Sequence, residues 1–389
     1  MIYFDHHATT PCDPSVVAAM LPCFADVFGN PSSRQHAAGQ EAERAVEAAR
    51  ARVAALIGAA PEDIVFTSGA TESDNLAVRG VARALEDRGR HLVTTEIEHS
   101  AVLEPCRTLE REGFSVTRVP VGPDGVLDPE RLAGALRPDT VLVSVMAANN
   151  EIGTLQPVAE VGRLCRERGI VFHSDAVQAL GRVPVDVEAW GADLLSLSAH
   201  KMYGPKGVGA LYLRRSRRPR VKLQPQAEGG GQEHGVRSGT LNVPGIVGFG
   251  EACALAGEAL AGGEPERLRR LRDRLLAGLR AAIDGVTVNG ALEPRLPGNL
   301  HVSIEGAPAE TLILSLGDRF ALSAGSACSE GGGRGSHVLR ALGLPDERIF
   351  TALRFGLGRY NTEAEVDAVV EAMAAAVAAA RARTAAARP

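Results

Sequence analysis

The segment LLSLSAHKMYGPKGVG, residues 194–209, passes from an apolar run directly into a polar loop. Three leucines in the run indicate a strand, and the loop after it carries Ser198, His200 and Lys201 before a Gly-Pro turn. Lysine is seldom buried without a partner, so a lysine placed directly after an apolar strand is a candidate for a desolvated amine. The segment therefore predicts a buried strand whose end presents Lys201 for amine chemistry.

The sequence around this segment alternates helical patterns with short apolar runs. Residues 40–58 form an amphipathic helical pattern that ends at a glycine. Strands alternating with helices indicate an α/β domain with a mainly parallel sheet, in which ligands collect beyond the carboxyl ends of the strands. The predicted strands are residues 64–69, 91–99, 140–151, 169–175, 193–201 and 207–214.

The pattern changes after the helix-rich stretch at 242–263. A charged amphipathic helix follows at 264–285, and short apolar runs at 285–290, 298–306 and 320–325 indicate further strands. We expect a large domain over residues 15–255. Residues 1–14 and 256–389 are expected to form a smaller α+β domain, which carries the loop around Cys328.

Composition excludes several classes of function. The chain has 42 Lys and Arg against 47 Asp and Glu, so its net charge of −5 provides no field to attract nucleic acid or an anionic membrane. Its beginning lacks the pattern of a signal peptide, and residues 366–389 are interrupted by charges. We expect a soluble, cytoplasmic protein that acts on a small molecule, with no membrane and no nucleic acid as partner.

Six cysteines are scattered singly, with neither paired spacing nor neighbouring histidines at metal-ligand spacing. The sequence predicts no metal site and no disulfide framework. Five of the six fit apolar helix faces as small hydrophobic residues. Cys328 differs because it lies in SAGSACSEGGGRGS, residues 323–336, a glycine-rich segment typical of a loop that adopts several conformations.

Other predicted strands also end in polar residues. Ala70 and Thr71 follow a strand and open a helix, where free backbone N–H groups suit a phosphate, although an ordinary helix cap is an alternative. His99 ends the next strand and is compatible with a packed residue as well as with a catalyst. Asp175, three residues before Gln178, can hold a cationic ring nitrogen or cap the following helix.

Together, these strand-end residues indicate a cofactor site that none of them indicates alone. A phosphate cradle, a histidine, an aspartate and a lysine at successive strand ends are the components needed to hold pyridoxal 5'-phosphate. In such a site the lysine forms a Schiff base, and the aspartate keeps the pyridine nitrogen protonated so that the ring withdraws electrons.

The sequence also resembles a known family, the NifS/IscS-like cysteine desulfurases of the class V aminotransferase group of fold-type I pyridoxal-phosphate enzymes. The resemblance runs in order from residue 5 to residue 359. It implies an α/β fold with a mainly parallel, seven-stranded type of sheet flanked by helices, plus a smaller α+β domain. The matching segments are DHHATTP, FGNPSS, FTSGATESDN, NNEIG, DAVQALG, SAHKMYGPKG, RSGTLN, GSACS, SHVLRALGL and LRFGLGR.

The resemblance implies a role for each matched residue. Lys201 forms the covalent link to the cofactor, His99 stacks on its ring and can move a proton, and Cys328 is the nucleophile. Asn150 and Arg354 take the substrate carboxylate, Arg354 as a two-pronged fork. The resemblance assigns cofactor contacts to Ala70, Thr71, Asn150, Asp175, Gln178, Ser198 and His200, and to Thr240 of the neighbouring subunit in a homodimer.

The activity implied is the removal of sulfur from L-cysteine. L-Alanine is released, and a persulfide forms on Cys328 for transfer to an acceptor protein in iron-sulfur cluster assembly or in thiolation of tRNA or a cofactor. A selenocysteine lyase is an alternative, since cysteine and selenocysteine differ by one atom. Another class V enzyme is also an alternative. A non-catalytic scaffold that binds a sulfur carrier is a third alternative, against which Lys201 and Cys328 argue together.

Overall fold

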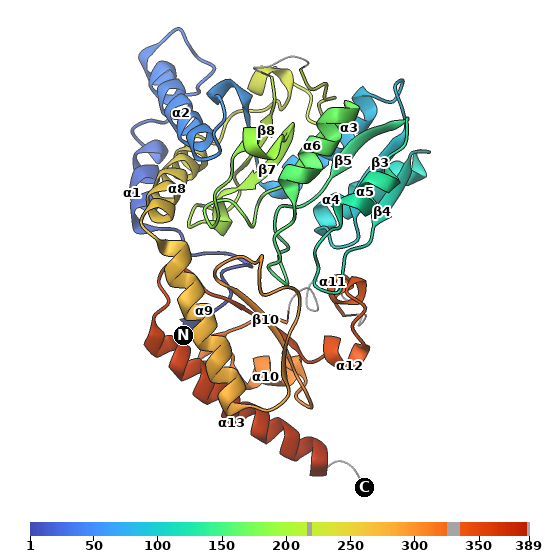
Figure 1. The fold of residues 1–389 in the computed structure, drawn as a ribbon. Coiled ribbons are helices and arrows are strands. Elements are labelled where there is room, and N and C mark those ends of the chain that lie inside the picture. The colour runs from blue at the N-terminus through green and yellow to red at the C-terminus, as the bar shows by residue number, and fades with distance from the viewer. Residues whose placement is uncertain (216–219, 325–334, 387–389) are drawn as a thin grey trace.

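A computed structural model describes residues 1–215, 220–324 and 335–386 (Figure 1). Among these residues, a seven-stranded sheet has the order β2-β8-β7-β6-β5-β3-β4. Strand β8 pairs antiparallel with β2 and β7, and the remaining pairs are parallel. The strands are β2 (Ile64–Thr67), β3 (His91–Thr95), β4 (Ser115–Val119), β5 (Thr140–Ser144), β6 (Val171–Asp175), β7 (Leu194–Ser198) and β8 (Gly209–Leu213). The mainly parallel α/β fold predicted from the sequence is confirmed.

Helices cover both faces of this sheet, which is why its strands read as continuous apolar runs. Alternate residues of one strand enter opposite layers of the core: in β8, Tyr212 belongs to one buried cluster and Leu211 to the other. Helices α3 and α4 cover one face, and α2, α6 and α8 lie over the other. The helices up to this point are α1 (Pro14–Met20), α2 (Ala37–Leu56), α3 (Ala70–Ala84), α4 (Ser100–Arg111), α5 (Pro129–Ala135), α6 (Val158–Arg168), α7 (Val187–Trp190) and α8 (Val243–Ala261).

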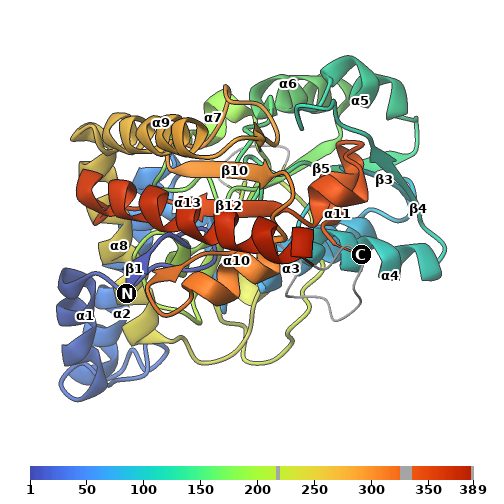
Figure 2. The same ribbon diagram turned by 90° about the horizontal axis from the view of Figure 1, so that it is seen from below.

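The later part of the chain forms a second hydrophobic core, which lies below the large sheet (Figure 1). Strand β10 pairs antiparallel with β9 and β12, and α13 crosses in front of them when the molecule is seen from below (Figure 2). The first residues join this part, because β1 pairs with β11. The elements are β1 (Ile2–Tyr3), α9 (Glu264–Ala282), β9 (Val286–Val288), β10 (Asn299–Ile304), α10 (Ala309–Leu316), β11 (Phe320–Ala321), α11 (His337–Ala341), α12 (Asp346–Ile349), β12 (Ala352–Gly356) and α13 (Glu363–Ala386).

Several details differ from the sequence-based expectation, among them an unpredicted edge strand and the end of a predicted strand. Strand β4 has no counterpart among the predicted strands, because its exposed and half-buried residues at the edge of the sheet lack an apolar run. The strand expected over 140–151 ends at Ser144. Beyond it the chain turns back on itself, and Ala148 forms an isolated bridge with Leu155.

Helix α8 is long and apolar enough to cross a membrane by length and composition alone. Its apolar residues are instead part of the core: Ile246, Phe249 and Cys253 are each at most 1% exposed. The helix packs along α2, as a core helix does.

Candidate active site

A cavity of about 780 Å³ opens beyond the carboxyl ends of β3, β5, β6 and β7. This is where the parallel sheet is expected to place a ligand. Residues from the beginning of the chain and from β12 close its other side. The cavity wall brings together these residues predicted from the sequence: Ala70, Thr71, His99, Asn150, Asp175, Gln178, Ser198, His200, Lys201 and Arg354.

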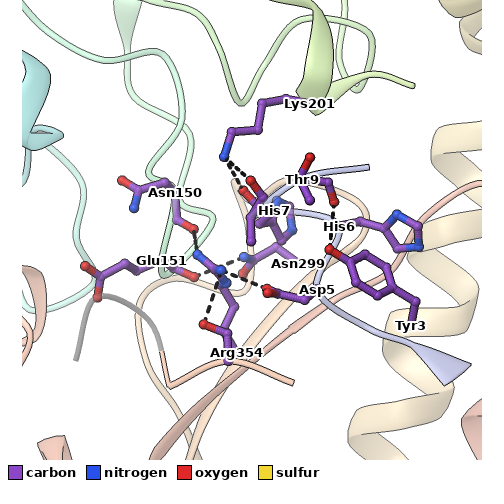
Figure 3. A network of polar contacts seen from close by, with 12 residues as sticks. Tyr3, Asp5, His6, His7, Thr9, Asn150, Glu151, Lys201, Asn299 and Arg354 are labelled. Carbon is purple, nitrogen blue, oxygen red and sulfur yellow. Dashed lines mark hydrogen bonds and ion pairs between the residues drawn. The ribbon is translucent and has the colours of Figure 1, made fainter. Parts of the chain in front are cut away.

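Lys201 extends from the short turn that follows β7. Its Nζ donates hydrogen bonds to the backbone carbonyls of His7 and Ala8, at 2.8 and 2.7 Å (Figure 3). Burial first, and then the positive charges of Arg182 and Arg354, lower the pKa of the amine to about 8, while Asp175 and Asp5 act in the opposite direction. Near neutral pH the amine therefore loses its proton far more readily than an exposed lysine does.

The N-terminus of α3 faces the same cavity. Gly69 precedes the helix with φ of 150°, a region that favours glycine, and a Cβ atom there would enter open space. Gly69 offers no side chain to cap the helix, and of the backbone N–H groups here the side chains of Thr67 and Glu72 accept only from those of Gly69 and Ser68. The backbone N–H groups of Ala70 and Thr71 and the positive end of the helix dipole are therefore available to an anion, which favours the phosphate cradle over the ordinary cap.

Asp175 ends β6 and is 7% exposed. Its Oδ1 accepts a hydrogen bond from the backbone N–H of Val177 at 2.9 Å, so it also shapes the turn after the strand. Burial raises the pKa of Asp175, while His99 and Lys201 lower it. His99 caps α4 through Nδ1, which accepts from the N–H of Ala101 at 3.2 Å, yet its side chain remains exposed on the cavity wall. His99 therefore caps the helix, and its catalytic role stays a prediction.

Arg354 lies at the lower side of the cavity and is 6% exposed. Its two Nη groups donate to the backbone carbonyl of Asn150 at 2.7 Å and to the carboxylate of Asp5 at 2.9 Å (Figure 3). A weaker contact reaches Ser323 at 3.3 Å. Among the described residues its buried Nε has no hydrogen-bond partner. The guanidinium is therefore held in place, with the Nε hydrogen and one Nη hydrogen left without a partner among the described residues.

The amide of Gln178 is engaged by other side chains. Its Oε1 lies 3.0 Å from His7 Nδ1 and also accepts from Arg182, and its Nε2 donates to the carbonyl of His7 at 3.0 Å. Arg182 reaches the carbonyl of Lys201 as well, at 3.0 Å. Sequence reasoning did not identify Arg182, because an arginine after a strand-end turn carries no distinctive pattern. Only the motif DHHATTP pointed to His7.

The structure adds other residues to the cavity wall that the sequence did not indicate. His200 bonds through Nδ1 to Thr9 Oγ1 at 3.1 Å, so the beginning of the chain reaches the turn after β7. Glu151 accepts from the hydroxyl of Ser336, and His337 Nε2 lies 3.0 Å from the carbonyl of Glu98. These contacts join segments far apart in sequence, which no local pattern reveals.

One predicted residue that the structure describes, Thr240, does not line this cavity. Thr240 is exposed, on a segment that a 2.8 Å ion pair between Arg237 and Glu72 ties to the first turn of α3. Cys328 lies outside the described residues. The nearest described residues on each side of it that reach the cavity are Ser323 and His337.

Fold and site together define a class of protein, the fold-type I transferases, in which a lysine beyond the end of a strand and an aspartate on a neighbouring strand face one cavity. The chain belongs to the aminotransferase class-V family, whose model matches residues 2–369. Enzymes of this family depend on pyridoxal phosphate.

Several individual proteins are similar to this chain. The cysteine desulfurase IscS of Anaeromyxobacter dehalogenans (strain 2CP-C) is 56% identical over 366 residues, which are 94% of this chain and 90% of that protein. A solved NifS-like protein is 40% identical, with a TM-score of 0.90, over 97% of this chain and 99% of that one. SspA, solved in complex with cysteine, is 35% identical, with a TM-score of 0.81, over 93% of this chain and all of that one.

Proposed function

We infer that this protein is a cysteine desulfurase, which removes sulfur from L-cysteine and releases L-alanine. The observation that carries the inference is the half-buried amine of Lys201, placed in one cavity with Asp175 and the N-terminus of α3. Relatives that are 50–56% identical over 94–96% of this chain carry the name cysteine desulfurase.

We propose that the cavity binds pyridoxal phosphate, and the residues present fit that cofactor. The free N–H groups of Ala70 and Thr71, with Ser198 and His200 beside them, suit its phosphate, and the carboxylate of Asp175 suits its ring nitrogen. Gln178 suits the ring hydroxyl, and His99 suits the face of the ring. When bound, the cofactor supplies an electron-withdrawing ring that stabilises negative charge on the Cα of the amino acid.

Lys201 supplies the amine that attaches the cofactor and later accepts the proton from the substrate Cα. Both tasks need a neutral amine, and a pKa of about 8 makes that form accessible near neutral pH. The carbonyls of His7 and Ala8 hold Nζ by its hydrogens, which directs the nitrogen before the substrate arrives. His99 is the second group on the wall able to carry a proton.

Arg354 binds the carboxylate of the substrate in this proposal. Its Nε is unpaired among the described residues, and Asp5 and Asn150 fix the plane of the guanidinium. Both Nη groups already have partners in the chain, which limits the hydrogens available for the predicted two-pronged contact. We propose that Nε provides one prong and that a remaining Nη hydrogen, with the neighbouring amide of Asn150, provides the rest.

We propose that the thiolate of Cys328 attacks the sulfur of the bound substrate. The new S–S bond forms as the carbon–sulfur bond breaks, so the thiol becomes a persulfide and the three-carbon remainder leaves as alanine after protonation. An acceptor protein then collects the outer sulfur. The placement of Ser323 and His337 on the cavity wall supports this role, because both belong to the segments that lead to Cys328.

We further propose a cytoplasmic homodimer in which Thr240 contacts the phosphate bound by the partner subunit. The exposure of Thr240 and its absence from the described cavity wall of its own chain support that arrangement. We also propose that the chain is divided into a large domain and a small domain. Helix α8 continues past residue 255 to Ala261, so we place their boundary at the Gly262–Gly263 turn instead.

The experiment that tests this function measures alanine and sulfide formed from L-cysteine in the presence of a reductant, with the purified protein, Lys201→Ala and Cys328→Ala. We expect a yellow wild-type protein with both products, and no sulfide from either variant. Full desulfuration by Cys328→Ala would remove that residue as the nucleophile. Preferential turnover of selenocysteine would favour a selenocysteine lyase, and a protein without cofactor or turnover would favour a binding scaffold.

A further inference from the structure

Three acidic side chains are buried together behind the cavity: Asp74 on α3, Glu98 after β3 and Asp175 at the end of β6. Asp74 and Glu98 are fully buried, and Asp175 faces the cavity. Among the described residues no lysine or arginine forms an ion pair with Asp74 or Glu98. Three negative charges so close together in a buried site would repel one another strongly, so the cluster holds fewer than three.

Of the three acids, Asp74 has the fewest contacts that would stabilise a negative charge. Neither carboxylate oxygen has a hydrogen-bond partner of good geometry among the described residues, although the hydroxyl of Ser196 lies near enough to favour the ionised form. The basic group beside it is His173, whose Nε2 lies 3.6 Å from Oδ1. The imidazole is already bonded to Ser144 through Nδ1 at 2.8 Å and to Ser196 through Nε2 at 3.0 Å. Burial lowers the pKa of His173 to about 3, so this ring is neutral and does not compensate a carboxylate.

The other two acids have more neighbouring groups that stabilise a negative charge. Glu98 accepts hydrogen bonds from Thr95 Oγ1 at 2.7 Å and from the N–H of Met146 at 2.9 Å. Asp175 accepts from the N–H of Val177, and the charges that favour its ionised form come from His99 and Lys201. A negative charge in the cluster is therefore most stable on Asp175. His173 and Asp175 are two residues apart on β6, so both project toward the face that α3 covers.

We propose that Asp74 is a positioning residue that remains a neutral carboxylic acid, so that the negative charge of this cluster rests on Asp175 beside the cofactor nitrogen. This inference rests on the proposed function, because it gives Asp175 its cofactor role. Asp74 lies three residues after Thr71 on α3, so the helix that offers its N-terminus to the phosphate also carries the acid behind the ring. Asp74 does not line the cavity and acts only through Asp175.

The test compares the full chain with Asp74→Asn, which imitates the neutral acid, by urea unfolding without added cofactor from pH 5 to pH 7. Burial, the charge of Asp175 and that of Glu98 raise the pKa of Asp74 well above its ordinary value, whereas Ser196 lowers it. In the proposal, Asp74 therefore holds a proton in the folded wild type that it loses in the unfolded chain, whereas protons held by Glu98 are common to wild type and variant. Relative to the variant, its unfolding equilibrium constant should rise about tenfold per pH unit.

Asp26→Asn, an exposed position, is the matched control and should leave the pH dependence of the wild type unchanged. If Asp74→Asn folds poorly, Asp74→Ser carries no charge at any pH and should show the same relative slope. Parallel stability curves for wild type and both variants would overturn the proposal, because they would mean that Asp74 gains no proton on folding.

A second measurement is the affinity of the apoprotein for pyridoxal phosphate, followed by fluorescence at pH 7 to 8. Asp74→Asn should keep the wild-type affinity, whereas Asp175→Asn should lose affinity. Weak binding by Asp74→Asn at every pH would contradict a neutral Asp74. A wild type that binds no pyridoxal phosphate would instead defeat the proposed function, while the unfolding experiment would still report the protonation of Asp74.

Discussion

The guanidinium of Arg354 on β12 donates to the carboxylate of Asp5, at 2.9 Å, from the opposite end of the chain. Both groups are at most 19% exposed in their side chains, so water screens the pair only weakly. Burial raises the pKa of Asp5, and Arg354 counteracts that rise. The beginning of the chain thereby orients the arginine that we assign to the substrate carboxylate.

Replacing Arg354 by lysine should weaken the binding of L-cysteine. A lysine keeps the charge but loses the planar fork and the unpaired Nε donor. The loss of one charge-assisted hydrogen bond of about 1.5–3 kcal/mol should raise KM by about 10- to 150-fold. Steady-state kinetics would check this, with Arg163→Lys on the exposed face of α6 as the control. An unchanged KM would assign the carboxylate to another residue.

Replacing Lys201 by alanine should abolish the attachment of the cofactor and lower kcat by about 10²–10⁴-fold or more, since general-base catalysis alone accounts for that range. The measurement is single-turnover alanine formation together with the absorbance of the purified protein. Lys206→Ala is a matched control on the same cavity wall and should keep the covalent attachment. A coloured Lys201→Ala protein with normal turnover would contradict our assignment.

A buried ion pair holds the segment that leads to Thr240. Arg50 on α2 forms two hydrogen bonds of 2.8 Å with Glu233, whose carboxylate also accepts from the N–H of Phe66 at 2.7 Å. Glu233 adopts φ of 47°, a left-handed conformation that is costly for a residue with a side chain. The three hydrogen bonds therefore keep this turn in a conformation that its backbone disfavours.

Replacing Glu233 by alanine should destabilise the protein by about 3–5 kcal/mol, because it leaves the buried Arg50 without a counter-charge. Urea unfolding would measure the loss. In Glu167→Ala, removal of the exposed pair with Arg163 should cost no more than about 1 kcal/mol. Equal effects from the two variants would show that the Arg50 pair contributes nothing beyond a surface contact.

The sequence predicted those parts of the fold and of the candidate site that a local sequence pattern encodes. Apolar runs that end in polar residues located Lys201, Asp175 and the Ala70–Thr71 turn, because parallel strands place their carboxyl ends at one edge. It gave no indication of the Arg50–Glu233 pair or the Asp74–His173 contact. Partners separated by 183 and 99 residues meet only through tertiary packing, and neither position interrupts a local pattern.

The pH dependence of cofactor capture tests the environment of Lys201 directly. Because burial first, and then Arg182 and Arg354, lower its pKa from 10.5 to about 8, the neutral amine that attacks the cofactor aldehyde becomes the major form above pH 8. The rate at which apoprotein captures pyridoxal phosphate should therefore rise from pH 6 to 8 and level off above pH 8. Stopped-flow absorbance would follow it. A rate that keeps rising through pH 10 would mean that Lys201 titrates like an exposed lysine, and that the carbonyls of His7 and Ala8 stabilise its charged form more than burial destabilises it.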